Sequence, residues 1–139
     1  MNTATATSLK GHAKHTFSIV VEIDQNWIDY LTQCGDILML QYAGYWLRGV
    51  EHRSDLGWLC WEGCDKCFQG EEPNRTAASR AWAAGEPLPE NWFRLDHAAA
   101  VRAWEEAVKR WGVDWYERTS STREDIALQL ALLGEVRYG

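Results

Sequence analysis

Residues 96–112 read DHAAAVRAWEEAVKRWG and carry the clearest helix signal in the chain. Asp96 is a typical N-cap residue and Gly112 a typical C-terminal stop, so we expect a helix between them. Large apolar side chains recur on one face of this helix, at Val101, Trp104, Val108 and Trp111. The opposite face carries acid–base pairs four residues apart, in the favourable order. An amphipathic helix of this kind needs a core to pack against, so the chain is expected to be globular.

Upstream of this helix, β-branched and aromatic runs predict short strands. They cover residues 16–23 (TFSIVVEI), 50–53, 57–61 and 92–95 (WFRL). Further helices are expected after Asp24, over residues 76–84, and from Thr122 to Gly134, the last of them buried and rich in leucine. Residues 40–50 fit either a helix or a strand, because short apolar runs show no clear period. These elements predict an α+β fold, in which a small antiparallel sheet of three or four short strands packs with three or four helices.

The chain length of 139 residues corresponds to one domain, and no linker divides it. Residues 1–14 are small and polar without periodicity, so we expect a mobile N-terminal arm ahead of a single α+β domain over residues 15–139. The first residues do not have the basic and apolar regions of a signal peptide, and no apolar run has the length of a membrane span. We therefore expect a cytoplasmic protein without membrane association.

The charge balance of the chain is acidic, because 14 Lys and Arg stand against 20 Asp and Glu, for a net charge of −6. Basic residues alternate with acidic ones, so no positive stripe is expected that would hold a phosphate backbone. An acidic surface favours encounter with a basic partner instead. The sequence thus predicts binding to a protein, with no direct binding to nucleic acid.

The sharpest local motif is the run CWEGCDKC, which holds Cys60, Cys64 and Cys67. Three thiols this close, on a loop after a strand, are able to converge on one zinc ion, with His52 or the remaining cysteine as the fourth ligand. The alternative is that the cysteines are unconnected and buried as small apolar residues, so that no cofactor is bound. A cysteine nucleophile beside His52 and Asp55 is a further alternative, although no glycine-framed nucleophile elbow accompanies it.

Tryptophan is unusually frequent, with 9 residues against 3 phenylalanines. Several large aromatic residues fall in the loop-rich middle of the chain: Trp58, Trp61, Phe68, Trp82 and Trp92. Side chains of this size either fill a second small core or form an exposed surface for a partner, since Trp is enriched at interaction hot spots. Both interpretations are open, and the second makes these residues a candidate partner-binding surface.

Two other stretches of the sequence, taken together, form a recognisable pattern. One is Tyr45-Trp46 followed by Gly49-Val50-Glu51, and the other is the C-terminal block 125–139, which reads DIALQLALLGEVRYG. Together they resemble small proteins of phages and prophages that carry a "YW…VE" element and end in "D…Q.ALxGExxYG". The resemblance covers the two ends of the expected fold, and the chain departs from it between Gly57 and Asn91. It implies a phage setting without a mechanism, because this group has no established activity.

The sequence therefore predicts a non-enzymatic accessory protein, encoded by a phage or mobile element, that acts by binding a host or viral protein in the host cytoplasm. Interference with a host defence system would suit such a protein. One alternative is a zinc-stabilised structural or adaptor module built on the cysteine motif. A second alternative is a small cysteine-dependent enzyme. A monomer and a homodimer are both compatible with the sequence, since a leucine-rich face on the last helix is able to pair two chains.

Overall fold

The computed structural model describes residues 2–9, 16–33, 43–53, 56–63 and 72–139; for residues 2–9 and 16–21 it describes the backbone alone. The elements follow in the order β1 (Asn2–Leu9), β2 (Thr16–Ile23), α1 (Gln25–Gln33), β3 (Leu47–His52), β4 (Trp58–Glu62), α3 (Arg75–Ala84), β5 (Trp92–Leu95), α4 (His97–Trp111), the 3-10 helix η2 (Trp115–Arg118) and α5 (Ser121–Leu133). The predicted α+β class is confirmed. In the described part of the chain, no helix has the length and apolar character that crossing a membrane requires.

The strands form two separate antiparallel sheets. In the larger one, β4 lies in the centre and pairs with β3 on one side and β5 on the other. The register places Trp58 opposite both His52 and Leu95, and a bulge between Gly49 and Glu51 shifts the β3–β4 pairing. The predicted strand at residues 92–95 is confirmed. The open choice for residues 40–50 is resolved in favour of a strand from Leu47 onward.

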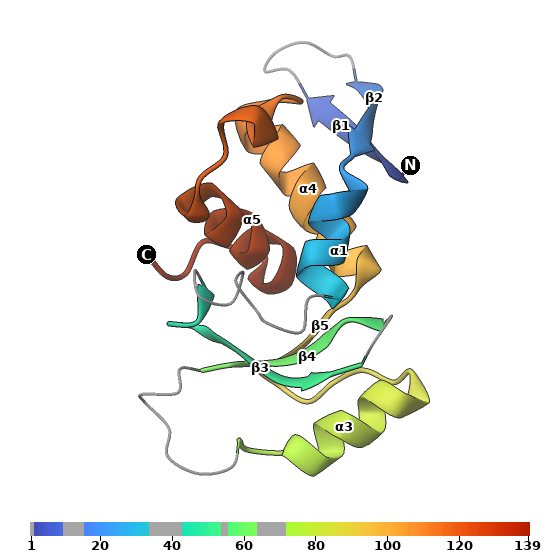
Figure 1. The fold of residues 1–139 in the computed structure, drawn as a ribbon, viewed down its shortest axis with the longest axis vertical. Coiled ribbons are helices and arrows are strands. Elements are labelled where there is room, and N and C mark those ends of the chain that lie inside the picture. Colours follow the sequence, from blue (N-terminus) through green and yellow to red (C-terminus); the bar gives the residue numbers. More distant parts are fainter. Residues whose placement is uncertain (1, 10–15, 34–42, 54–55, 64–71) are drawn as a thin grey trace.

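The three-stranded sheet forms the middle layer of the molecule (Figure 1). Helices α1, α4 and α5 lie on one side of it, and α3 lies on the other. The main core sits between the sheet and the three helices, and a second, smaller core joins the sheet to α3. Because neighbouring side chains on a strand point to opposite faces, Trp58 and Cys60 of β4 enter the main core, while Leu59 and Trp61 enter the smaller one.

Helix α4 forms as predicted and organises the main core. The side chain of Asp96 accepts a hydrogen bond from the Ala99 amide at 2.9 Å, and the helix ends at Gly112. Trp104 packs edge to face against Trp27 of α1 and Trp115 of η2, with ring centroids 5.3 and 5.1 Å apart. Such aromatic pairs add to the free energy gained by burial alone, so this tryptophan cluster fixes α1 and η2 onto α4.

Residues 2–9 differ from the predicted arm without regular structure, because they form strand β1. The strand pairs antiparallel with β2 over its whole length, from Asn2 opposite Ile23 to Leu9 opposite Thr16. Its sequence, NTATATSL, alternates threonine and alanine with a period of two, which is the period of a strand. The small side chains concealed this signal, since a search for apolar runs does not detect alanine alternating with threonine.

The last helix, α5, begins slightly earlier than predicted, and its buried face is partly polar. Ser120, rather than Thr122, is the N-cap, and its side chain accepts from the Arg123 amide at 3.3 Å. The buried face includes the polar residues Glu124, Asp125 and Gln129, whereas several of the leucines are only partly buried. The predicted helix is therefore present, and its buried face combines Ala127 and Leu128 with three polar side chains.

Candidate binding site: an acid-rimmed hollow

A hollow of about 650 Å³ opens at the end of the molecule farthest from α3. Two segments far apart in the sequence form it: residues 22–26, where β2 passes into α1, and residues 113–117, where α4 passes into η2, together with Trp104 of α4. We call it the acid-rimmed hollow. The packing of Trp104 against Trp27 and Trp115 brings the two segments together, because it joins α1, α4 and η2.

The floor of the acid-rimmed hollow is apolar. Ile23 and Trp104 are buried there, Trp104 with 4% of its surface exposed, and Tyr116 lies beside Trp104 with ring centroids 5.5 Å apart. The indole N–H of Trp104 has no hydrogen-bond partner in the described structure. Val113 stands at the edge of the hollow with 56% of its surface exposed. A ligand with an apolar part would therefore find both a floor and a wall to contact.

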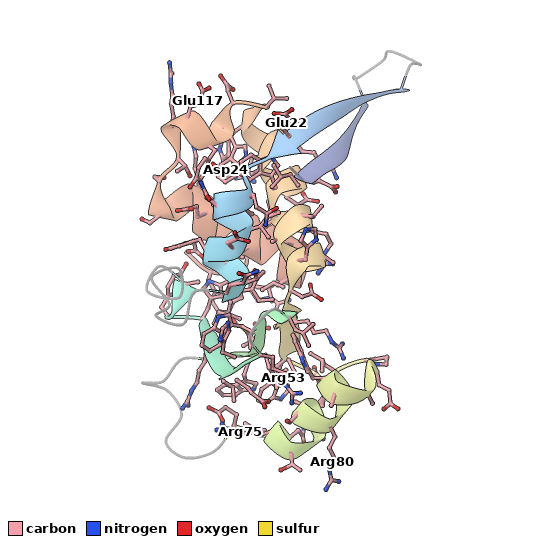
Figure 2. The ribbon with its side chains drawn as sticks, turned by 45° about the vertical axis from the view of Figure 1, so that its right-hand side comes forward. Glu22, Asp24, Arg53, Arg75, Arg80 and Glu117 are labelled. Carbon is pink, nitrogen blue, oxygen red and sulfur yellow. The ribbon has the colours of Figure 1, made fainter. Side chains whose placement is uncertain are left out.

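The rim of the hollow is acidic. Its carboxylates come from both segments: Glu22, Asp24, Asp114 and Glu117. Figure 2 shows Glu22, Asp24 and Glu117 at this end of the molecule, whereas the labelled arginines, Arg53, Arg75 and Arg80, lie at the other end. Among the described residues that line the hollow, there is no lysine, arginine or histidine.

Within the described residues, none of these four carboxylates takes part in a salt bridge. Asp24 has one local role, since its Oδ1 accepts from the Asn26 amide at 2.9 Å at the start of α1. No described basic side chain pairs with the rim, so its negative charges favour a positively charged ligand.

The sequence alone does not reveal this site. In the sequence, each segment shows only two acids that flank apolar residues. Glu22 and Asp24 flank Ile23, and Asp114 and Glu117 flank an aromatic pair. Either pattern alone is common at the surface of a protein. Only the tertiary packing of α1 against α4 shows that the two patterns share one hollow.

The Tyr45-Trp46 stretch and the C-terminal block meet elsewhere, in a hydrogen-bonded network that we call the C-terminal clasp. Asp125 of α5 is its centre, and it accepts from the Tyr45 hydroxyl, from Trp46 Nε1 at 2.7 Å and from Gln129 Nε2 at 3.2 Å. The Gln129 side chain also binds the backbone of Arg137 and Tyr138, with Oε1 accepting from both amides at 2.8 Å. The network therefore fastens the C-terminal residues to α5.

The clasp extends to the sheet through the last residues of the chain. The Tyr138 ring stacks on Trp46 with centroids 5.8 Å apart, and its hydroxyl donates to Glu62 of β4. Arg137 binds the same carboxylate through two hydrogen bonds of 2.8 and 3.0 Å. Burial and the bond to Asp125 raise the pKa of Tyr45 to about 12, so this hydroxyl keeps its proton at neutral pH. The clasp thus has the features of a structural device, in which each polar group named is paired with another.

The cysteine motif lies only partly within the described residues. Cys64 and Cys67 fall outside them, as do Cys34, Asp55 and Phe68. Cys60 is buried in the main core, and burial raises the pKa of its thiol well above the usual range. The thiol therefore stays protonated at neutral pH, which is the opposite of what a nucleophile needs.

His52 has other partners than a metal ion. Its Nε2 lies 3.0 Å from the Thr32 carbonyl, and its ring packs on Trp58 with centroids 4.5 Å apart. Among the described residues, no three or more His, Cys, Asp or Glu side chains are grouped so that they could hold a metal ion. A zinc site that uses Cys64 and Cys67 therefore stays a prediction, with no contact among the described residues in its favour.

The predicted aromatic surface is wrong for four of its five residues, because these side chains are buried. Trp58 packs in the main core, and Trp61, Trp82 and Trp92 form the smaller core with Leu59. The sheet separates the middle tryptophans into two groups, and α3 covers the second group. They therefore hold the layers together and do not offer a surface to a partner.

Comparison with known proteins adds no further constraint. The chain matches no family model, no curated protein and no solved structure. The function therefore has to be inferred from the geometry of the chain itself. The acid-rimmed hollow is the feature whose lining best indicates what kind of ligand it would bind.

Proposed function

We propose that this chain is a non-enzymatic binding protein that holds a basic segment of a partner protein in the acid-rimmed hollow. The observation that carries the proposal is the combination of an apolar floor with a rim of four carboxylates and no basic residue in the lining. Lysine and arginine fit this combination, because their aliphatic stems pack on apolar surface while their charged ends remain near carboxylates.

The charge of the whole chain supports the same partner. A net charge of −6 attracts a basic protein over a longer range than any single contact, and it speeds the encounter. The hollow then supplies the local selectivity. The partner surface is accordingly basic. The tryptophans of the middle segment take no part in the contact, since their side chains are buried.

The biological setting of the proposal comes from the resemblance to phage proteins. On that basis the partner is a host or viral protein in the host cytoplasm, and the chain is an accessory protein of a phage or mobile element. Proteins that handle nucleic acids are rich in basic segments. A component of a host defence system that binds nucleic acid would therefore suit the hollow.

A binding measurement with a defined probe tests the proposal. The probe is a fluorescein-labelled peptide of about nine arginines, titrated by fluorescence anisotropy at low salt. We expect Glu22→Gln/Glu117→Gln to weaken binding about fivefold, since two exposed charge pairs contribute roughly 0.5 kcal/mol each. The control is Glu86→Gln/Glu90→Gln, which removes the same charge from exposed positions beyond α3.

The control decides between the hollow and general attraction. If the two double variants lose affinity equally, the peptide follows net charge alone and the proposed site is wrong. The proposal also fails if the wild-type chain does not bind the peptide at low salt. A loss confined to the Glu22 and Glu117 variant supports it.

A further inference from the structure

The β1–β2 hairpin has free edges. Within the described residues it is a two-stranded sheet, separate from the three-stranded one, and neither strand has a second neighbour. β1 packs on α4, whereas β2 lies on the side of the hairpin away from that helix (Figure 2). The outer edge of β2 therefore presents backbone N–H and C=O groups that no described strand pairs with, and such an edge is a template for another strand.

This edge leads directly into the acid-rimmed hollow. The last two residues of β2, Glu22 and Ile23, are also part of the lining of the hollow. A chain that lay along β2 would therefore reach the carboxylates at the end of the strand. The edge and the hollow form one continuous surface, with backbone groups along its length and negative charge at its end.

We propose that the partner segment binds as an extended strand along the outer edge of β2, and that it places a lysine or arginine side chain in the acid-rimmed hollow. This inference rests on the proposed function and names the form of its partner. Main-chain hydrogen bonds supply affinity in this mode of binding, and pockets for alternate side chains supply selectivity. β2 has 8 residues, so it accommodates a partner segment of about that length.

The chemistry of the surface favours a strand over a helix as the occupant. A helix satisfies its own backbone groups internally and would leave those of the β2 edge unpaired. An extended segment pairs with the edge, so a basic residue near one end of the segment is able to reach the carboxylates at the end of β2.

The test uses a fluorescein-labelled octapeptide of alternating arginine and valine, with two N-methylated versions of the same sequence. In a strand, successive N–H groups point to opposite sides, so methylation of the odd residues or of the even residues blocks one side only. We expect one methylated peptide to bind at least about tenfold more weakly than the parent, and the other to keep an affinity close to it. A tenfold loss corresponds to about 1.4 kcal/mol.

A second measurement locates the peptide on the protein. Hydrogen exchange of the amides in residues 16–23 should slow on addition of the parent peptide, whereas exchange in β3 and β5 should not change. If both methylated peptides bind as well as the parent, the strand inference is wrong, although the hollow still binds basic segments. If the parent fails to bind while nona-arginine binds, the inference fails in the same way.

The alternative occupant of the β2 edge, to be separated by experiment from a basic partner strand, is a second copy of this chain. Two β2 edges that paired would give a dimer, and exchange in residues 16–23 would then slow with protein concentration in the absence of peptide. Analytical ultracentrifugation measures this directly. A stable dimer whose formation protects β2, and which the peptide does not dissociate, would overturn the inference of a basic partner strand.

Discussion

At the scale of single residues, Glu124 is a buried carboxyl group whose protonation links the stability of the fold to pH. It lies on the buried face of α5 with 8% of its surface exposed, and it accepts a hydrogen bond from Trp27 Nε1 at 3.0 Å. Burial raises the pKa of Glu124, and the bond from Trp27 opposes this increase only in part. A carboxyl whose pKa is higher in the folded state than in the unfolded state destabilises the fold above both values and regains stability as the pH falls through them.

We therefore expect Glu124→Gln to stabilise the protein at neutral pH by about 1 kcal/mol, because it removes the cost of burying a charged carboxylate. Glutamine keeps an oxygen for the Trp27 N–H and removes the buried charge. Below the pKa of the unfolded chain the wild-type carboxyl is protonated in both states, so the difference between the two proteins should disappear near pH 4. Urea unfolding at pH 7.5 and pH 4 measures it.

The exposed change Glu86→Gln serves as the control, and it should leave the unfolding midpoint nearly the same at both pH values. If Glu124→Gln destabilises the protein equally at both pH values, the carboxylate makes a contact that glutamine does not replace, and burial is not the dominant effect on its pKa.

The buried acids also show why residue-level prediction failed in α5. The sequence from Asp125 to Leu133 contains several leucines, so a local rule buries the leucines and exposes the acids. The structure does the reverse at Asp125 because Tyr45 and Trp46 bring hydrogen-bond donors to it from a segment about eighty positions away in the chain. No local pattern encodes such a partner, although the resemblance had already paired the two stretches.

At the scale of elements, the sequence alone was enough to predict a helix or strand where its cap residues or its apolar pattern were clear. Helix α4 has an N-cap aspartate, a glycine stop and an apolar stripe, and strand β5 has two aromatic residues and a leucine beside Arg94. Strand β1 has none of these features, and its pairing with β2 depends on the alternation of small residues. The elements with a signal within about fifteen residues were therefore predicted, and those defined by a partner were not.

Gly57, immediately before β4, is a position where the pairing of two strands leaves no space for a side chain. Its φ of +106° is unfavourable for other residues, and a Cβ there would lie 2.1 Å from the carbonyl oxygen of Leu95 in β5. We expect Gly57→Ala to destabilise the protein by about 3 kcal/mol or more, because the clash adds to the backbone strain and separates β4 from β5. Thermal or urea unfolding followed by circular dichroism provides the measurement.

Gly85, the C-cap of α3, is the matched control for this prediction. Its φ of +68° is also positive, but a Cβ would meet no atom within 4 Å. Gly85→Ala should therefore cost only about 1 kcal/mol of backbone strain. Equal losses for the two variants would show that strain alone accounts for Gly57 and that the approach to Leu95 is relieved by a small shift.

At the scale of the whole molecule, the sheet separates two cores of unequal size. The main core joins α1, α4 and α5 to one face, while the smaller core joins α3 to the other through Leu59, Trp61, Trp82 and Trp92. The acid-rimmed hollow belongs to the first part and lies far from α3 (Figures 1 and 2). It could not be predicted from the sequence, since its two walls are joined only by the packing of α1 and η2 on α4.

This division predicts that α3 opens separately from the rest of the molecule. Trp82 is the only large apolar side chain that α3 buries, beside Ala78 and Ala81, so it supplies most of the apolar area that holds the helix to the sheet. Trp82→Ala should remove about 3 to 5 kcal/mol, which is more than the remaining contacts of α3, such as the hydrogen bonds of Ser79 with Glu51 and Arg53, are expected to offset. Hydrogen exchange in residues 75–84 should then approach the rate of an unfolded chain, while α4 stays protected.

The exposed change Arg80→Ala on the same helix is the control, and it should leave both exchange rates nearly unchanged. Because the hollow lies on the other part, Trp82→Ala should also bind the arginine peptide with wild-type affinity. If α4 loses its protection together with α3, the two cores unfold as one cooperative unit. The sheet would then transmit the loss of one layer to the other, and the hollow would depend on α3 in spite of its distance from it.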